Sequence, residues 1–117
     1  MGFFDFLKPP PGEGTVHGLL ALMKQANGTE LVLAPGAAPR ALVDGRLRPL
    51  SGRPLDPEET RRLCCSLFTE REAAEFEKSH AVEFAFGGKG LGRYTARIVS
   101  DDGKVSGVIT ATLPPRP

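Results

Sequence analysis

The segment GGKGLGR, residues 87–93, combines glycines with a lysine and an arginine, a composition found in loops that bind phosphate. A Walker A loop needs Ser or Thr after its lysine, and this chain has Gly90 there. A dinucleotide-binding fingerprint needs a glycine where this chain has Arg93. A strand pattern follows, so no helix N-terminus is expected to face an anion. The sequence therefore predicts that residues 87–92 connect two strands of a hairpin.

Other residues capable of chemistry are few. Cys64 and Cys65 are adjacent, and neighbouring residues of a helix point in different directions, so two reduced thiols in a reducing cytoplasm are expected. His17 and His80 are the two histidines, and neither has a second ligand at metal spacing. A nucleophilic pair of Cys65 with His80 is open in principle but has no supporting motif. The sequence predicts no metal site, no cofactor and no catalytic acid–base pair.

Composition narrows the class of protein. The chain has 117 residues, which fits one domain, and its 15 Lys and Arg against 14 Asp and Glu leave a net charge of +1. A nucleic-acid-binding protein usually has a basic excess or stripe, and this chain has neither. No apolar run approaches the roughly 20 residues of a membrane span, and the N-terminus lacks the basic start of a signal peptide. These features predict a cytoplasmic protein that does not bind nucleic acid.

The first residues form an apolar tip on a stiff tether. The tip consists of Phe3, Phe4, Phe6 and Leu7, and the sequence KPPPGEG follows it. Proline fixes the backbone angle φ and stops a helix, so the tether acts as a spacer. Two interpretations stay open: the tip folds back on its own domain, or it docks on a protein or weakly on a membrane surface. The predicted division is therefore tip and tether at 1–14, a domain at 15–114 and a tail at 115–117.

Apolar spacing and capping signals predict three helices. The first is expected from an N-cap at Thr15 to residue 27. Two more begin at capping boxes, in which Asp56 and Thr69 are each followed three residues later by a glutamate. The last helix is expected to face the core with three residues, which are Ala73, Phe76 and His80.

Alternating apolar residues predict six strands, three before the second helix and three after the third. Asp44-Gly45 and Asp102-Gly103 are favoured pairs for two-residue hairpin turns. Short connections imply a mostly antiparallel sheet of about six strands with roughly three helices on one side, an α+β fold. An exposed edge strand is expected near Ala111, where two copies could pair into a homodimer.

Several motifs occur in a fixed order along the chain. They are NGTELVL, GAAPRALVDGRLRPL (residues 36–50), LDPE (55–58), LFTEREAAEFE (67–77), EFAF, GLGRYTAR and ATLP (111–114). From Gly18 to Pro114 this series resembles the N-terminal domain of type IV pilus retraction ATPases of the PilT kind, in the secretion-ATPase superfamily. The resemblance implies a PAS-like fold that stacks against the ATPase domain of the adjacent subunit in a hexamer.

Departures from the family pattern argue against ATP hydrolysis. The sequence ends at Pro117, where the linker to the Walker motifs would begin, so the ATPase domain is expected to be absent. Arg93 matches the first family arginine that faces nucleotide, but Thr95 and Ala111 replace the next two, and Val32 replaces a strand histidine. Threonine and alanine cannot replace the planar fork of an arginine. Completion of a neighbour's ATP site is therefore not expected either.

The resulting prediction is a non-catalytic protein–protein interaction module, an adaptor or regulator of type IV pilus or motility machinery that contacts a motor ATPase or polar complex. Its candidate contact residues are the apolar tip and a mainly basic group around one hairpin, which consists of Arg40, Asp44, Arg46, Arg48 and Arg53. Arg93, farther along the chain, is a further candidate. A PAS-like sensor of a small ligand is the alternative, although the apolar core pattern predicts a filled pocket. An enzyme that uses Cys65 is a third option.

Overall fold

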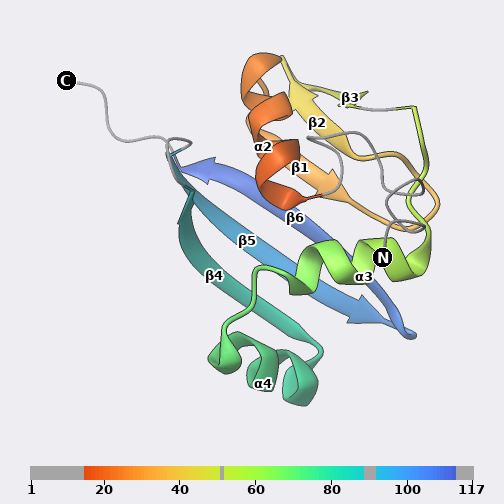
Figure 1. Ribbon diagram of the computed structural model, residues 1–117, viewed down its shortest axis with the longest axis vertical. Helices are drawn as coiled ribbons and strands as arrows, with labels where there is room; N and C mark the ends of the chain where they lie inside the picture. Colours follow the sequence, from red (N-terminus) through yellow and green to blue (C-terminus); the bar gives the residue numbers. More distant parts are fainter. Residues whose placement is uncertain (1–14, 51, 89–91, 113–117) are drawn as a thin grey trace, which may run out of the picture.

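The computed structural model describes residues 15–50, 52–88 and 92–112 (Figure 1). Its elements are α2 (Val16–Gln25), β1 (Glu30–Leu33), β2 (Arg40–Val43), β3 (Arg46–Pro49), α3 (Pro57–Cys65), α4 (Glu70–Ser79), β4 (Ala81–Gly88), β5 (Gly92–Asp101) and β6 (Lys104–Thr112). This order of one helix, three strands, two helices and three strands confirms the predicted α+β class.

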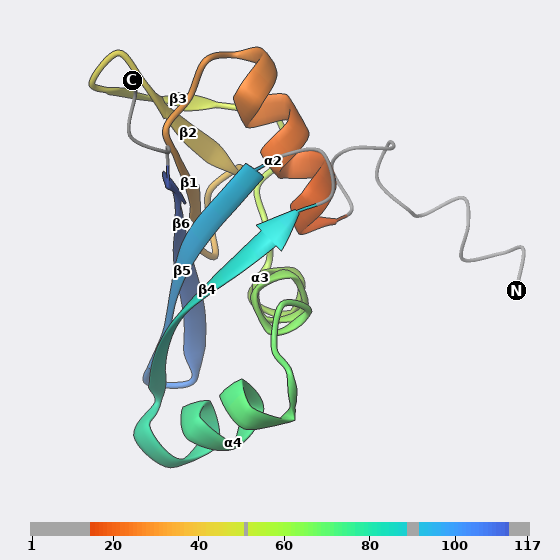
Figure 2. The ribbon, with the colours of Figure 1, turned by 90° about the vertical axis from the view of Figure 1, so that its left-hand side faces the viewer.

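The six strands form one antiparallel sheet in the order β3-β2-β1-β6-β5-β4. All three described helices lie on the same side of this sheet (Figure 2). The predicted edge near Ala111 is wrong, because β6 lies between β1 and β5 and the Ala111 N–H donates to the Thr29 carbonyl at 2.9 Å. The order of strands depends on the long-range pairing of β1 with β6, which no local pattern encodes. The true edges are β3 and β4.

Side-chain caps begin the three helices, as predicted. The Thr15 hydroxyl accepts a hydrogen bond from the first turn of α2 at 3.0 Å. At α3, an Asp56 carboxylate oxygen accepts from the Glu59 N–H at 2.7 Å, and Glu59 accepts from the Asp56 N–H at 3.1 Å. At α4, the Glu72 carboxylate accepts from the Thr69 N–H and hydroxyl, and these bonds lower the pKa of Glu72. Such caps satisfy N–H groups that a helix leaves unpaired.

The tight turns also follow the sequence. Asp44 and Gly45 have φ values of 52° and 80°, and Asp102 and Gly103 have 57° and 79°, as a two-residue turn between twisted strands requires. Strands β4 and β5 pair up to Gly88 opposite Gly92. The glycine-rich segment therefore joins two paired strands, and no helix follows it, which confirms the interpretation as a hairpin connection.

The core lies between the sheet and helices α2 and α3. Its buried hydrophobic residues are Val16, Leu19, Leu20, Met23, Leu31, Leu33, Ala41, Leu55, Leu63, Cys64, Tyr94, Ala96, Ile98, Val105 and Ile109. Among the described residues, one polar residue is buried, which is Thr60. Its hydroxyl donates to the Asp56 carbonyl at 2.9 Å. Side chains thus occupy the space where a sensor of this fold would hold a ligand.

Helix α4 is less buried than predicted. Ala73 and His80 are exposed, while Phe76 is half-buried against Phe68, with ring centroids 5.2 Å apart. The reason is its position: α4 lies beside the edge strand β4 rather than over the middle of the sheet (Figure 2). His80 ends the helix in the left-handed region, with a φ of 62°.

No helix among the described residues is long and apolar enough to cross a membrane.

Candidate functional site

The β2–β3 hairpin carries most of the predicted basic group, and its register divides that group. Residues directly opposite each other in an antiparallel pair share a face of the sheet. Arg46 and Arg48 lie opposite Val43 and Ala41, so both are on the face that the helices cover, at its exposed margin. Arg40 lies opposite Pro49 and is on the other face. The structure therefore brings Arg46 and Arg48 together and separates Arg40 from them. Asp44 is exposed in the turn between the strands.

Arg53 is held at the start of α3. Its guanidinium is 2.9 Å from a Glu59 carboxylate oxygen, with half of the arginine side chain exposed. This pair neutralises the charge of Arg53 locally, although an exposed pair contributes at most about 1 kcal/mol. The basic cluster of the hairpin therefore does not gain a free positive charge from Arg53.

Arg93 is exposed near the start of β5, opposite Gly87 on one side and Thr112 on the other. Thr95 shares its face, and the Thr95 and Thr112 hydroxyls are 3.2 Å apart. Ala111 is half-buried and points to the opposite face, because side chains alternate along a strand. The positions where the resemblance places nucleotide-facing arginines thus carry no second guanidinium near Arg93.

The predicted apolar tip of Phe3, Phe4, Phe6 and Leu7 lies outside the described residues. Its role in binding a partner stays a prediction, as do the roles of the six charged residues above.

One face of the sheet carries no described helix, and we call it the bare face (Figure 2). Val32 lies opposite Val108 on this face, and Leu42 lies opposite Leu47 in the neighbouring row. Leu47 is 47% exposed, and the other three are half-buried. These four residues form the bare-face patch, which the sequence analysis missed. The signal was present, because Val32, Leu42 and Val108 occupy the alternate positions where a one-sided sheet usually has polar residues.

Charged residues flank the bare-face patch. Register places Arg97 next to Val108 and Arg40 next to Val32, so that one arginine lies on each side. Arg97 is 3.7 Å from Glu83 across β4 and β5. The Nε atom of Arg40 is buried, and no described residue accepts a hydrogen bond from it. A buried donor without an acceptor costs about 1–3 kcal/mol, so an acceptor brought to this position would be favoured.

The two thiols are poorly suited to nucleophilic chemistry. Burial raises the pKa of Cys64 to about 12, and the nearby Cys65 thiol adds to the shift. Burial also raises the pKa of Cys65, which Arg61 partly offsets. The thiolate is the reactive form, so a raised pKa lowers reactivity at neutral pH. No group of three or more potential metal ligands occurs in the described parts of the chain.

The raised pKa of Cys64 predicts a loss of stability in alkali. An unfolded thiol releases its proton near pH 9.0, whereas folded Cys64 keeps its proton to about pH 12. The stabilisation is therefore complete below pH 9 and is lost as the pH rises towards 12. Between pH 8 and 10.5 the free energy of unfolding should fall by about 2 kcal/mol more than in Cys64→Ala. Urea unfolding of both proteins at the two pH values measures this, and equal losses would contradict it.

Comparison with known proteins agrees with this architecture. No protein-family model matches the chain. The type IV pilus ATPase PilU of Pseudomonas aeruginosa is 34% identical over 76 residues, which is 65% of this chain and 20% of PilU. The pilus retraction motor PilT, solved with bound ADP, superposes with a TM-score of 0.81 and 26% identity over 88% of this chain and 30% of PilT.

A third similar structure is the ATPase DotB of Legionella pneumophila, with a TM-score of 0.68 and 18% identity over 85% of this chain and 29% of DotB. This likeness shows the fold alone. The chain spans about a fifth of the length of PilU and about a third or less of each of the two solved chains. The sequence relation to PilU and the superposition on PilT agree on one conclusion. The chain is homologous to the PilU/PilT-type secretion ATPases, and its fold matches the N-terminal region of PilT.

Proposed function

We propose that this chain acts as a non-catalytic protein-binding module, an adaptor or regulator of a motor ATPase or polar complex in type IV pilus machinery. The homology to PilU and PilT supports the association with this machinery. Its place of action is the cytoplasm, where its free thiols stay reduced.

The observation that carries this proposal is the bare-face patch. Val32 and Val108 place apolar surface on the two central strands of the bare face, with Arg40 and Arg97 on either side of them. Leu42 and Leu47 extend this surface to the edge strand β3. Apolar surface with a polar rim is typical of protein contacts. The patch lies on the face of a sheet, and small-molecule sites are usually concave. A protein partner therefore fits it better than a small ligand.

The types and environments of the reactive residues support a role without catalysis. The 117 residues contain no Walker A pattern, and the two cysteines have raised pKa values. Arg93 lacks the further arginines that the resemblance would place beside a nucleotide. We therefore expect this chain to act by binding and not by turnover.

The test is a binding assay between the full chain and purified PilT- and PilU-type ATPases of its own organism. We expect a complex that survives gel filtration and a changed ATPase rate of the partner. The chain alone should release no phosphate from Mg-ATP, and stoichiometric cleavage by the pure chain would overturn the non-catalytic role. If neither ATPase forms a complex with the chain, the link to the motor is wrong.

A variant of the apolar tip separates its two interpretations in the same assay. Serine substitutions at Phe3, Phe4 and Phe6 should weaken the complex without changing the melting temperature if the tip docks on the partner. A lower melting temperature with an unchanged complex would show that the tip packs on its own domain.

A further inference from the structure

We propose that the open edge of β4 and the facing side of α4 bind an extended, basic segment of another protein, which adds to the sheet as a seventh strand. The site, which we call the β4–α4 groove, is lined by Arg71, Glu72 and Glu75 of α4 and by residues 81–85 of β4. It is separate from the bare-face patch and does not depend on the pilus association.

Unpaired backbone groups along β4 provide the hydrogen bonds. In an antiparallel pair, successive residues direct their N–H and C=O groups alternately towards and away from the neighbouring strand. The His80 carbonyl accepts from the Ser100 N–H at 2.9 Å, so the even-numbered residues of β4 pair with β5. The odd-numbered residues then direct their backbone groups outwards, and no described residue pairs with them. They are Ala81, Glu83, Ala85 and Gly87.

The two edges of the sheet differ in how well they are protected. Proteins usually block an edge with short strands, prolines, bulges or positive charges. Strand β3 has four residues, of which Arg46 and Arg48 are positive and Pro49 lacks an N–H. Strand β4 has eight residues, AVEFAFGG, and Glu83 is the one charged residue among them. The β4 edge is therefore long and poorly protected, so that it can pair with a further strand.

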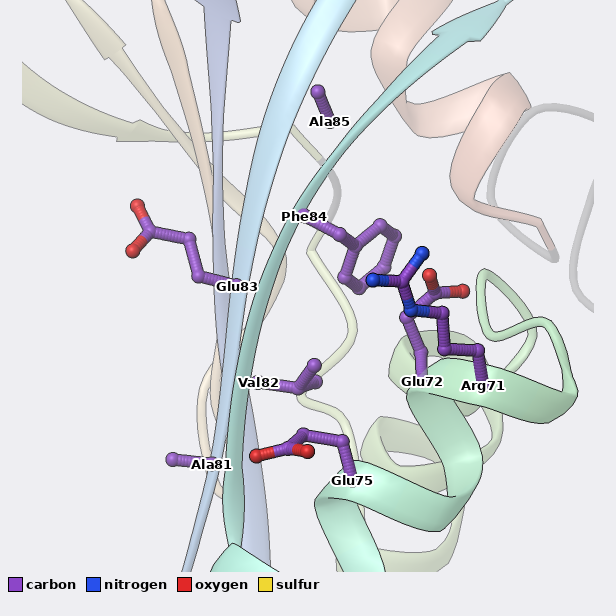
Figure 3. Close-up of a pocket in the computed structure, with 8 residues that line it drawn as sticks. All are labelled: Arg71, Glu72, Glu75, Ala81, Val82, Glu83, Phe84 and Ala85. Carbon is purple, nitrogen blue, oxygen red and sulfur yellow. The ribbon is translucent and has the colours of Figure 1, made fainter.

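The groove has a volume of about 540 Å³ and a distinct wall on its helix side. Figure 3 shows Val82 and Phe84 pointing from β4 towards α4, while Ala81 and Glu83 point to the other side. Glu72 and Glu75 extend from α4 towards the same space. An incoming strand would lie between a helix and a strand, with every second side chain facing α4.

The charged side chains of the groove favour a basic segment as its occupant. Glu72 and Glu75 bring two carboxylates to the α4 side of the groove, against the single guanidinium of Arg71. The Glu83 carboxylate points to the other face, where it lies 3.7 Å from Arg97. Lysine or arginine on the incoming strand can lay its alkyl stem along Phe84 and place its charge near Glu72 and Glu75. Recognition by added strands combines main-chain hydrogen bonds with alternate side chains in this way. The expected occupant has basic residues at every second position.

The same charges disfavour a second copy of this chain as occupant. Two β4 edges that pair about a twofold axis would place both α4 helices on one side of the joined sheet. The carboxylates of the two grooves would then face each other, and like charges opposite one another are destabilising. A basic partner removes this repulsion.

The probe is a blocked decapeptide of alternating lysine and threonine, with a glutamate–threonine decapeptide as its control. Amide hydrogen exchange of the full chain, followed residue by residue by NMR, reports the site of binding. The lysine peptide should slow exchange of the N–H groups of Ala81, Glu83, Ala85 and Gly87. It should leave the even-numbered residues of β4 unchanged, because these already pair with β5.

Variants then test each part of the groove by fluorescence anisotropy of the labelled peptide. Glu75→Lys should weaken binding about tenfold, whereas Glu77→Lys, which makes the same charge change outside the groove lining, should have little effect. Ala85→Pro removes an outward N–H that β5 does not use, so binding should fall about tenfold. Should Ala85→Pro not fold, Glu75→Lys and the exchange pattern still decide the question.

Three results would overturn the proposal. The first is equal binding of the glutamate peptide, and the second is the absence of alternate protection along β4. The third is protection that rises with protein concentration alone, together with a dimer in sedimentation, which would identify a second copy as the occupant. All are measured on this chain alone, so a missing complex with a pilus ATPase does not affect them.

Discussion

Gly107→Val is expected to lower the free energy of unfolding by about 3 kcal/mol, the upper end of the usual effect of overpacking. Gly107 lies in β6 where α3 crosses the sheet. A Cβ atom there would lie 2.7 Å from the Ile98 Cδ1 atom and 3.0 Å from the Cys64 Sγ atom. Both neighbours are fully buried, so the valine methyl groups have no space into which to move. Urea unfolding followed by circular dichroism measures the change.

Two further variants make this result specific. Gly107→Ala should cost about 1 kcal/mol, because the end of the Ile98 side chain can turn away from a single methyl group. Gly52→Val is the matched control, since nothing lies within 4 Å of a Cβ atom at that position. A Gly107→Val protein with native stability would show that α3 does not pack closely on β6.

Paired substitution of Val32→Glu and Val108→Lys is expected to weaken binding of the protein partner about a hundredfold. The two valines lie opposite each other on the two central strands of the bare face, and charge in the middle of a contact surface is most harmful to a protein contact. Opposite charges on adjacent strands favour the existing register, so the fold should be retained. Titration of the partner measures the affinity, and thermal unfolding measures the stability.

The control for this variant makes the same two charge changes at the C-terminal end of α2, at Ala26→Glu and Gln25→Lys. Both positions are exposed, and α2 lies on the opposite side of the sheet. Affinity should stay within about twofold of the native value. Equal weakening by both variants would mean that long-range charge, and not the bare-face patch, governs binding.

Local features of the fold were predictable because their physical causes are local. The caps at Thr15, Asp56 and Thr69 and the turn at Asp44-Gly45 each depend on residues within a few positions. The alternation of buried residues along β5 and β6 was likewise visible in the sequence.

Features that depend on distant residues were not predictable in this way. Ala73 was expected in the core, but its exposure depends on the position of α4 beside an edge strand. Ala111 was expected near an edge, but its burial depends on β6 pairing with β1. Arg40 was predicted to form one basic group with Arg46 and Arg48 because the three are close in sequence, and strand register separates Arg40 from the other two. The bare-face patch became visible only when four strands were aligned.

The pairing of β1 with β6 also has a consequence for how the chain folds. Strands β1–β3 form one three-stranded meander and β4–β6 form another, and the sheet joins them through this single pair. Contacts between residues about 80 positions apart, such as Leu31 and Ile109, close slowly because a long loop must first lose entropy. During synthesis β1 therefore cannot complete its pairing until β6 has been made. Its apolar edge is open to chaperones or to wrong partners until β6 leaves the ribosome.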